Sequence, residues 1–591
     1  MRVLRVLASP RVAALAALLA LPAGPATAAV ISGEVRDADG EPLAGAMVRV
    51  DPPQATPGAL TVTVFTGADG RYRADLGERS AAGRAVRVSL IGHAVRGEAP
   101  GPLAASDGPH RVDFTLEPVD NIAGQVPASA WLQQSFPDDT ETLHALWICS
   151  GCHQLPDAPM QNYARLTRQF DTQGRINAWS AMVKYMRVKT FDLGPEGSAW
   201  PGLPYEVKSD PALSGYDLQD EALIASALGR HLPTDYSRLE HYDPGAPLGV
   251  TPDTVIREYQ MPREGFAREV GLSARSPYAW GAEQNFNRLV RLDPATGELK
   301  DFKVPFDKAS GPHTILDDDA GNLWVTSIEN DLLMRFDPET AEWTLYQDFG
   351  AGALIHDVAY DSNYQVGFDR NGFLWATLIG QNRVGGLNPE TRETVAFDAP
   401  QPEGRTAIHT ALYGIVMDSA RERVWYAQLG GGVGSFNVLT REFETHIEFD
   451  MGEGPRRLAI DERDRIYVPL MGASEVFVYD TRAGREIARV PLPERWAATY
   501  NVTWDPWRQC LWVGTTNADA IYRMDPETFE FTRFPLPRKG AFLRMITFDR
   551  HTANLWTAYS ATGDGDHAPD ALVEIDPGDG VRPPKPDVAV R

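Results

Sequence analysis

The chain has 591 residues and a formal charge of −24, from 56 basic and 80 acidic residues. Apolar residues make up 43% of it and 14 residues are tryptophan, which is typical of a folded protein with a substantial core. The length predicts several domains, and the negative charge argues against nucleic acid or anionic lipid as a partner, because both would be repelled.

The first 28 residues have the pattern of a secretory signal peptide. Arg2 and Arg5 precede an apolar run over residues 12–21, and small residues follow at Ala26 and Ala28. We therefore expect residues 1–28 to be cleaved on export, with the mature protein periplasmic or secreted. The apolar run is too short to cross a bilayer and no later stretch reaches that length, so no membrane span is predicted.

Residues 30–120 alternate apolar and polar side chains in short runs, separated by turn residues such as Asp39-Gly40 and Pro42. This pattern predicts a small β-sandwich. The segments SGEVRDADGEPLAGAMVRV, TGADGRYRADL and VRVSLIGH resemble the carboxypeptidase regulatory-like family. The resemblance implies an accessory module with a carbohydrate-binding-like fold, and a structural spacer is the alternative.

Residues 125–237 have helical periodicity, and we expect three helices there. The first carries WICSGCH at 147–153, in which Cys149 and Cys152 lie one helical turn apart and His153 follows directly. Covalent attachment of a haem requires two thiols at this spacing and an adjacent histidine for the iron. A zinc site would need two more ligands nearby, and the third cysteine, Cys510, is distant in the sequence.

This region resembles the small class I cytochrome c fold. We therefore predict one covalent haem c on Cys149 and Cys152, with His153 as an axial ligand of the iron; a redox dithiol and a metal clip are the alternatives. The segment AWSAMVKYM resembles the helix that follows the haem motif in multidomain cytochromes, so Met186 is the predicted distal ligand. Met182 and Met160 are the other candidates, and methionine at helical spacing is commonly core filler.

Residues 250–580 repeat one pattern, in which an aromatic anchor and a turn residue recur every 42–51 residues. Each unit reads as four short strands, so the pattern predicts a seven-bladed β-propeller. The aromatic anchors are Trp280, Trp324, Trp375, Trp425, Tyr467, Trp512 and Trp556. The last unit lacks an outer strand that residues 254–262 could supply, which would close the ring, and residues 581–591 read as a disordered tail.

Counting back about eleven residues from each anchor reaches the predicted start of each innermost strand, which lines the central channel. These positions hold cations, a carboxylate, a histidine and phenols, which suit a small polar or anionic ligand; a water-filled structural channel is the alternative. The predicted positions are Glu269, His313, Tyr364, Tyr413, Arg456, Tyr500 and Arg544.

The blade sequence GPHTILDDDAGNLWVTSIENDLLMRFDPET resembles the virginiamycin B lyase family of seven-bladed propellers. The resemblance implies a metal-assisted elimination by histidine and glutamate, for which His313 and Glu283 are the candidate catalytic residues, with a divalent metal in the propeller. Later blades lack the corresponding glutamates, so a complete lyase site is not predicted.

Together the segments predict a multidomain, mainly β protein: a β-sandwich and a seven-bladed propeller joined by a small helical cytochrome c-like domain. The favoured function is an exported c-type haem protein, in which the propeller binds a small ligand or substrate and the haem exchanges electrons, with a redox protein as a further partner. The alternatives are a lyase with an accessory haem domain and a non-catalytic binding or sensing module.

Overall fold

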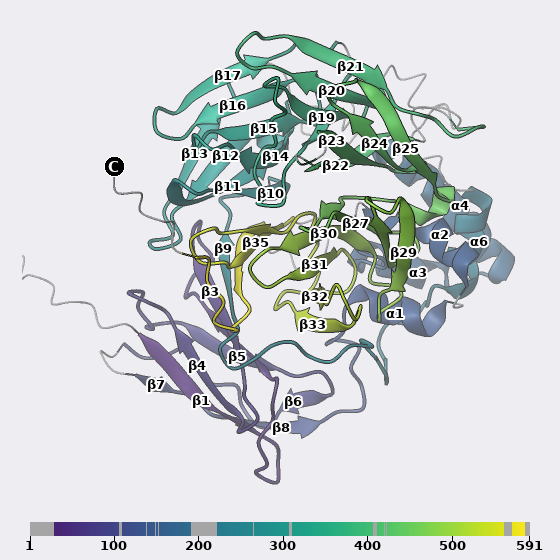
Figure 1. Ribbon diagram of the computed structural model, residues 1–591. Coiled ribbons are helices and arrows are strands. Elements are labelled where there is room, and N and C mark those ends of the chain that lie inside the picture. The colour runs from purple at the N-terminus through teal and green to yellow at the C-terminus, as the bar shows by residue number, and fades with distance from the viewer. Residues whose placement is uncertain are drawn as a thin grey trace, which may run out of the picture.

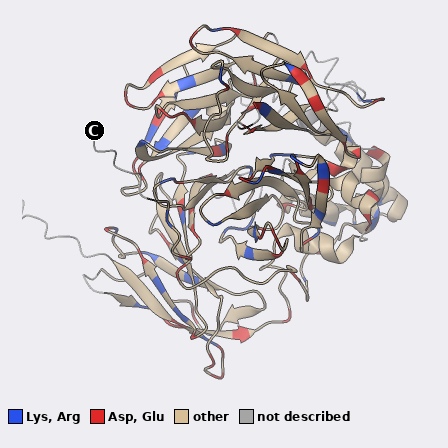
Figure 2. Ribbon diagram, in the orientation of Figure 1, with Lys and Arg blue, Asp and Glu red and all other residues tan. Residues whose placement is uncertain are grey.

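The computed structural model describes residues 29–584, except 106–108, 137–138, 148, 152, 191–220, 264, 307–309, 351, 406–409, 419, 421 and 561–569. The predicted signal peptide, residues 585–591 of the predicted tail and Cys152 lie outside the described residues. Within the described part, no helix is both long and apolar enough to cross a membrane. Acidic and basic residues are interspersed along the ribbon (Figure 2).

The described chain is mainly β, and most of its strands belong to seven antiparallel sheets arranged as a β-propeller (Figure 1). In the first six sheets the strands are consecutive, and the first strand of each is the innermost. The first sheet contains β10 (Ala267–Ser273), β11 (Ser276–Glu283), β12 (Arg288–Leu292) and β13 (Leu299–Lys303), and the second contains β14 (Pro312–Asp317), β15 (Leu323–Ser327), β16 (Leu333–Asp337) and β17 (Glu342–Tyr346). The third contains β18 (Ile355–Val358), β19 (Leu374–Leu378), β20 (Arg383–Leu387) and β21 (Thr394–Asp398). The fourth contains β22 (Leu412–Asp418), β23 (Arg423–Gln428), β24 (Gly432–Asn437) and β25 (Glu442–Glu448).

The remaining three sheets complete the ring. They are β26 (Ala459–Ile460), β27 (Arg465–Leu470), β28 (Glu475–Asp480) and β29 (Arg485–Pro491); β30 (Thr499–Asp505), β31 (Cys510–Thr515), β32 (Ala520–Met524) and β33 (Phe531–Pro535); and β34 (Thr547–Phe548), β35 (Leu555–Tyr559), β36 (Ala571–Asp576) and β9 (Val255–Gln260). The strand predicted to close the ring is β9, which pairs antiparallel with β36.

A local hydrogen-bond pattern recurs in the second, third and sixth blades. In the turn before the second strand, an aspartate accepts backbone N–H groups with one oxygen and the indole N–H of the anchor tryptophan with the other. Asp318 accepts from Trp324 at 3.0 Å and Asp369 from Trp375 at 3.1 Å. Because the aspartate lies six residues before the tryptophan in both blades, the tight turn is encoded locally.

The N-terminal strands form two sheets against each other. One contains β1 (Val30–Arg36), β4 (Arg71–Asp75), β6 (His93–Val95), β7 (His110–Arg111) and β8 (Phe114–Pro118), and the other contains β2 (Met47–Asp51), β3 (Leu60–Phe65) and β5 (Ala85–Ser89). Strand β3 also pairs antiparallel with β9, so the second sheet continues into the last blade. The outer edge of that blade is therefore covered by a strand of the sandwich.

The helices between the sandwich and the propeller are α1 (Ala128–Ser135), α2 (Thr140–Leu146), α3 (Ala158–Thr167), α4 (Thr172–Thr190) and α6 (Glu221–His231). This is more than the three helices expected. The segment predicted to carry CSGCH on a helix instead breaks after α2, and the motif begins in the short 3₁₀ turn η1 (Cys149–Gly151). Asp139 caps α2 by accepting the Thr142 N–H.

The helical segment docks on the fifth and sixth blades, beside β29 in Figure 1. The buried carboxylate of Glu494 accepts hydrogen bonds from the hydroxyls of Tyr242 and Tyr522, each at 2.8 Å, and from Ser129. The Asn517 side chain accepts the Leu155 N–H at 2.7 Å and donates to the Leu155 carbonyl at 3.0 Å. These contacts fix Leu155 and the ends of the helical segment on the propeller.

Replacing Glu494 by alanine would leave the hydroxyls of Tyr242, Tyr522 and Ser129 buried without their acceptor. We expect the free energy of unfolding to fall by about 2–4 kcal/mol, because several buried donors lose a charged partner together. Urea unfolding followed by far-UV circular dichroism measures this loss. Glu486→Ala, a substitution at an exposed position on β29, is the matched control. Equal urea midpoints for the two variants would contradict a stabilising role of the hydrogen bonds to Glu494.

Candidate functional site

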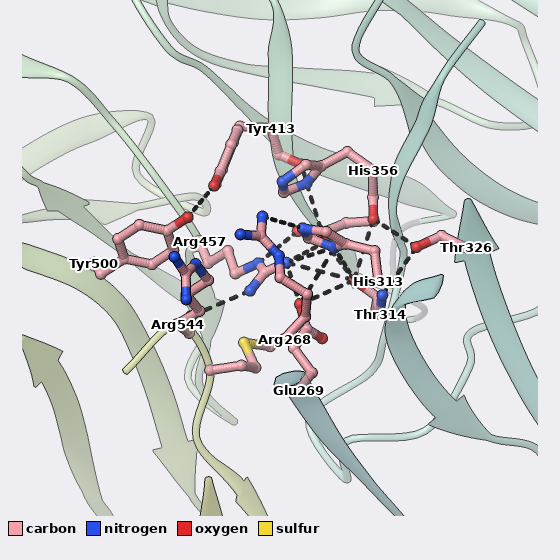
Figure 3. A network of polar contacts seen from close by, with 12 residues as sticks. Arg268, Glu269, His313, Thr314, Thr326, His356, Tyr413, Arg457, Tyr500 and Arg544 are labelled. Carbon is pink, nitrogen blue, oxygen red and sulfur yellow. Dashed lines mark hydrogen bonds and ion pairs between the residues drawn. The ribbon is translucent and has the colours of Figure 1, made fainter. Parts of the chain in front are cut away.

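The inner strands bring a cluster of charged and aromatic side chains to the propeller channel (Figure 3). Strands β10, β14 and β18 supply the acidic and imidazole groups and, from β10, the guanidinium of Arg268. Strands β22 and β30 supply the phenols, and the chain preceding β26 and β34 supplies the other guanidiniums. The cluster consists of Arg268, Glu269, His313, Thr314, His356, Asp357, Tyr413, Arg456, Arg457, Tyr500 and Arg544.

Arg457 is the central cation of this cluster and is 1% exposed. Its Nε donates to Asp357 Oδ2 at 3.0 Å and its Nη2 to Asp357 Oδ1 at 2.8 Å, which is a bidentate pair. Arg457 also pairs with Glu269 and donates to the Arg544 carbonyl at 3.1 Å. The guanidinium therefore joins four blades at the channel axis.

The two carboxyl groups around Arg457 differ in acidity. Burial raises the pKa of Glu269 to about 7, against the opposing effect of Arg457. Burial also acts on Asp357, but Arg457 and His356 outweigh it and hold the pKa of Asp357 well below its usual range. Asp357 is thus the ionised partner of the arginine, and Glu269 is the group that can take up a proton near neutrality.

Both histidines of the cluster are held neutral. Burial, with Arg268 next in effect, lowers the pKa of His313, and burial lowers the pKa of His356 to about 4 despite the adjacent Asp357. Arg268 Nη2 lies 2.7 Å from His313 Nε2. Since a guanidinium only donates, Nε2 accepts from Arg268. The other ring nitrogen, Nδ1, lies 3.3 Å from Arg457 Nη2 and 3.4 Å from Glu269 Oε1.

Three residue types that commonly bind metals meet in the cluster. One ligand atom from each of His313, His356 and Asp357 lies within 4.8 Å of the others. However, both oxygens of Asp357 already accept from Arg457. A divalent ion would have to share this carboxylate with a fixed positive charge. The triad as it stands therefore does not fit the divalent metal considered from the sequence.

Six of the seven predicted channel positions belong to this cluster or its rim: Glu269, His313, Tyr413, Arg456, Tyr500 and Arg544. The seventh, Tyr364, lies instead between β18 and β19, with φ of 64° and its ring 4.5 Å from that of Tyr360. The third blade has an insertion before its anchor tryptophan, so counting back a constant distance passed over His356.

Sequence reasoning missed five members of the cluster: Arg268, Thr314, His356, Asp357 and Arg457. A usable signal existed for two of them, because the "IHDV" of the third blade matches the "PHTI" of the second as the start of an inner strand. The two arginines neighbour predicted positions in sequence and could be assigned only once the direction of each side chain was known.

Glu283, the second catalytic candidate, lies at the end of β11 and is fully buried. It accepts from Arg263 Nε at 2.8 Å, and burial raises its pKa to about 7. Among the described residues no hydrogen bond or ion pair joins Glu283 to His313. The structure therefore does not bring the two lyase candidates together.

At the mouth of the channel, the guanidinium of Arg456 lies among three aromatic rings. Its Cζ is 5.0 Å from the ring centroid of Trp147, 4.7 Å from that of Tyr413 and 5.1 Å from that of Tyr500. The hydroxyls of Tyr413 and Tyr500 are hydrogen-bonded to each other. Trp147 belongs to the helical segment, so this aromatic cage is built from both parts of the chain.

The short turn Cys149–Gly151 lies directly beside this cage. A Cβ added to Gly151 would lie 3.0 Å from Arg456 Nη2, and Thr516 Oγ1 donates to the Ser150 carbonyl at 2.9 Å. His153 Nδ1 lies 2.8 Å from the Gln154 carbonyl and 3.0 Å from Asp157 Oδ2. With Nδ1 oriented by these acceptors, Nε2 is the nitrogen suited to a metal ligand.

The described residues fit a covalently attached haem. Cys149 and His153 lie on one short turn, and the orientation of His153 through its Nδ1 is the arrangement typical of metal-bound histidines. The methionines Met160, Met182 and Met186 all pack in or against the same helical core, so each remains a candidate distal ligand. Cys510 is buried in β31, where burial raises the pKa of its thiol.

Comparison with solved structures finds propeller-like neighbours. Virginiamycin B lyase from Staphylococcus aureus aligns with 14% identity and a TM-score of 0.46, covering 55% of this chain and 99% of that chain. A streptogramin B lyase aligns with 16% identity and a TM-score of 0.44, over 55% and 98% of the two chains. A catalytically inactive histidine-to-alanine variant of the S. aureus enzyme, with quinupristin, aligns with 14% identity and a TM-score of 0.45, over 55% and 99%.

At these identities and scores the neighbours transfer no activity to this chain. No protein-family model matches the sequence, and no curated protein matches it significantly.

Tyr500 is expected to ionise at a lower pH than an ordinary tyrosine. Burial opposes its ionisation, but the surrounding guanidiniums, Arg456 foremost, outweigh burial and lower the pKa of Tyr500. Titration of phenolate absorbance at 295 nm should show an early step that Tyr500→Phe removes. Tyr426→Phe is the control, since burial alone raises the pKa of Tyr426; an unchanged early step in the Tyr500 variant would contradict the assignment.

Proposed function

We propose that the chain is an exported c-type haem protein whose propeller channel binds a small polar ligand and whose helical segment transfers electrons. The observation that carries this proposal is the contact between Gly151 of the CSGCH turn and Arg456 of the channel mouth. A group bound at the mouth would lie beside the turn that carries the haem ligands. Electrons could then pass over a short distance between the two sites.

The chain's own residues have separate roles in this proposal. Cys149 and Cys152 would hold the haem, which supplies one-electron redox chemistry when bound, and His153 would be an axial ligand oriented by Asp157. Met186 remains the preferred distal ligand from the sequence, with Met182 and Met160 as alternatives. The N-terminal sandwich would be an accessory binding module, and residues 1–28 would direct the chain to the periplasm or outside.

A metal-assisted carbon–oxygen lyase is the second candidate. The close approach of His313, His356 and Asp357 favours it, because imidazole and carboxylate ligands of this kind bind divalent metals. The bidentate pair between Arg457 and Asp357 and the separation of Glu283 from His313 weigh against it. A non-catalytic binding or sensing module is the remaining candidate.

Periplasmic expression with haem-maturation machinery tests the haem. We expect a red protein that stains for covalent haem on a denaturing gel and shows a reduced-minus-oxidised difference spectrum. Cys149→Ala should lose most of the covalent stain because one thioether bond cannot form, whereas the matched control Cys510→Ala should retain it. A colourless wild-type protein that Cys149→Ala does not change would overturn the proposal.

The lyase alternative predicts a different result. Ring opening of a cyclic depsipeptide with no change in the haem spectrum, abolished by a chelator and by His313→Ala, would establish that reaction. Under the redox proposal we expect no chelator-sensitive ring opening, and we expect reduction of the haem by a bound donor. Mass spectrometry of the depsipeptide and the haem absorption band measure the two outcomes in one sample.

A further inference from the structure

Arg456 differs from the other arginines of the channel cluster. Arg456 is only 4% exposed, yet its guanidinium forms no hydrogen bond or ion pair with any described residue. By contrast, Arg268 donates to His313, Arg457 to Asp357 and Arg544 to Ser560. Burying a guanidinium without a hydrogen-bonding partner is costly, so this position requires an explanation.

The aromatic cage compensates only part of this cost. Trp147, Tyr413 and Tyr500 present rings to the cation, which is favourable, but rings cannot accept the five N–H donors of a guanidinium. Arg489, on β29, also lies over two rings, those of Phe449 and Phe477, and it has Glu453 as its carboxylate partner. Arg456 has the same setting without a carboxylate.

The phenols beside Arg456 supply another donor. Tyr413 and Tyr500 carry two hydroxyl protons between them, and one of these is used in the hydrogen bond that joins them. Neither hydroxyl has a further partner among the described residues, although both residues are at least 95% buried. One O–H donor therefore remains in the cage, next to the unpaired guanidinium.

The net charge of the cluster also favours a negatively charged ligand. Four guanidiniums, those of Arg268, Arg456, Arg457 and Arg544, surround two carboxylates, those of Glu269 and Asp357, which leaves an excess of two positive charges. In a buried setting such an excess attracts an anion strongly. The donors, a planar guanidinium and one hydroxyl, suit a planar acceptor with two oxygens, such as a carboxylate.

A small apolar pocket adjoins the cage. Its cavity volume is about 10 Å³, the space of about one water molecule, and it shares Trp147 with the cage. Its other lining side chains are largely apolar, among them Leu146, Leu155, Met471 and Trp496. The apolar lining beside the donors favours an organic acid whose carboxylate is next to an apolar group.

We propose that Arg456, with the hydroxyls of Tyr413 and Tyr500, binds the carboxylate of a small organic acid at the contact between the propeller and the CSGCH turn. This inference rests on the proposed function in one respect, since it names the ligand class of the same channel mouth. A carboxylate bound there would lie beside Gly151 and would place a negative charge next to the haem-binding turn.

Calorimetric titration of the haem-loaded protein with sodium benzoate tests the site. We expect saturable binding of one benzoate per chain, with little or no binding of benzamide, its neutral analogue. Arg456→Met should weaken the affinity for benzoate about ten- to a hundredfold, the loss expected for a charge-assisted hydrogen bond. Arg456→Lys should retain part of it, and the matched control Arg489→Met should bind like the wild type.

A second readout is the haem midpoint potential. Bound benzoate should lower it in the wild-type protein, because a nearby negative charge stabilises the oxidised iron, and should leave it unchanged in Arg456→Met. Thermal melting establishes that each variant is folded, and Arg456→Lys keeps the test valid should the methionine variant unfold.

The outcomes separate this inference from the proposed function. Absence of benzoate binding in a protein that carries haem, or equal binding by wild type and both Arg456 variants, would overturn the carboxylate site and leave the redox proposal standing. Tighter binding of inorganic phosphate than of benzoate would also overturn the carboxylate assignment. Arg456-dependent benzoate binding in a protein without haem would support the site and overturn the redox proposal.

Discussion

Strand β9 pairs with β36 of the last blade along one edge and with β3 of the sandwich along the other. These two ladders close the propeller and leave neither edge of β9 open. Closure matters for the rest of the molecule because the inner strands of all seven blades converge only in a complete ring. The charged groups in the channel therefore depend on a pairing between residues more than 300 positions apart.

Convergence creates a concentration of charge with little access to water, and the cluster is arranged to tolerate it. Arg457 is neutralised by Asp357 and Glu269, and the two histidines stay uncharged. Glu269, whose pKa burial raises to about 7, can adjust its charge near neutrality. A metal ion is unnecessary to balance these carboxylates, since the guanidinium already does so.

Docking of the helical segment turns the channel mouth into a composite site. The hydrogen bonds to Glu494 and those of Asn517 hold the helical segment on two blades. Trp147 thereby lies over Arg456. The channel mouth of the propeller and the turn at Gly151 are thereby brought close together. Neither part alone contains the complete cage, which is why we assign the redox and binding roles to the joined structure.

The sequence by itself determined the features that depend on near neighbours. In the second, third and sixth blades the anchor tryptophan and the aspartate six or seven residues before it lie in one turn. Short-range patterns of this kind made the repeat, its seven units and the closing strand predictable. The spacing of Cys149 and His153 is likewise local. Both patterns are visible in the sequence because their physical cause acts over a few residues.

Only the tertiary structure decided which side chains meet. The insertion in the third blade displaced Tyr364 and put His356 and Asp357 in the channel, and the direction of adjacent side chains sent Arg457 to the axis and Arg456 to the mouth. The contact of Arg456 with Trp147 and Gly151 joins residues about 300 positions apart. Such contacts arise from packing whole blades and helices together, and no short-range pattern in the sequence records them.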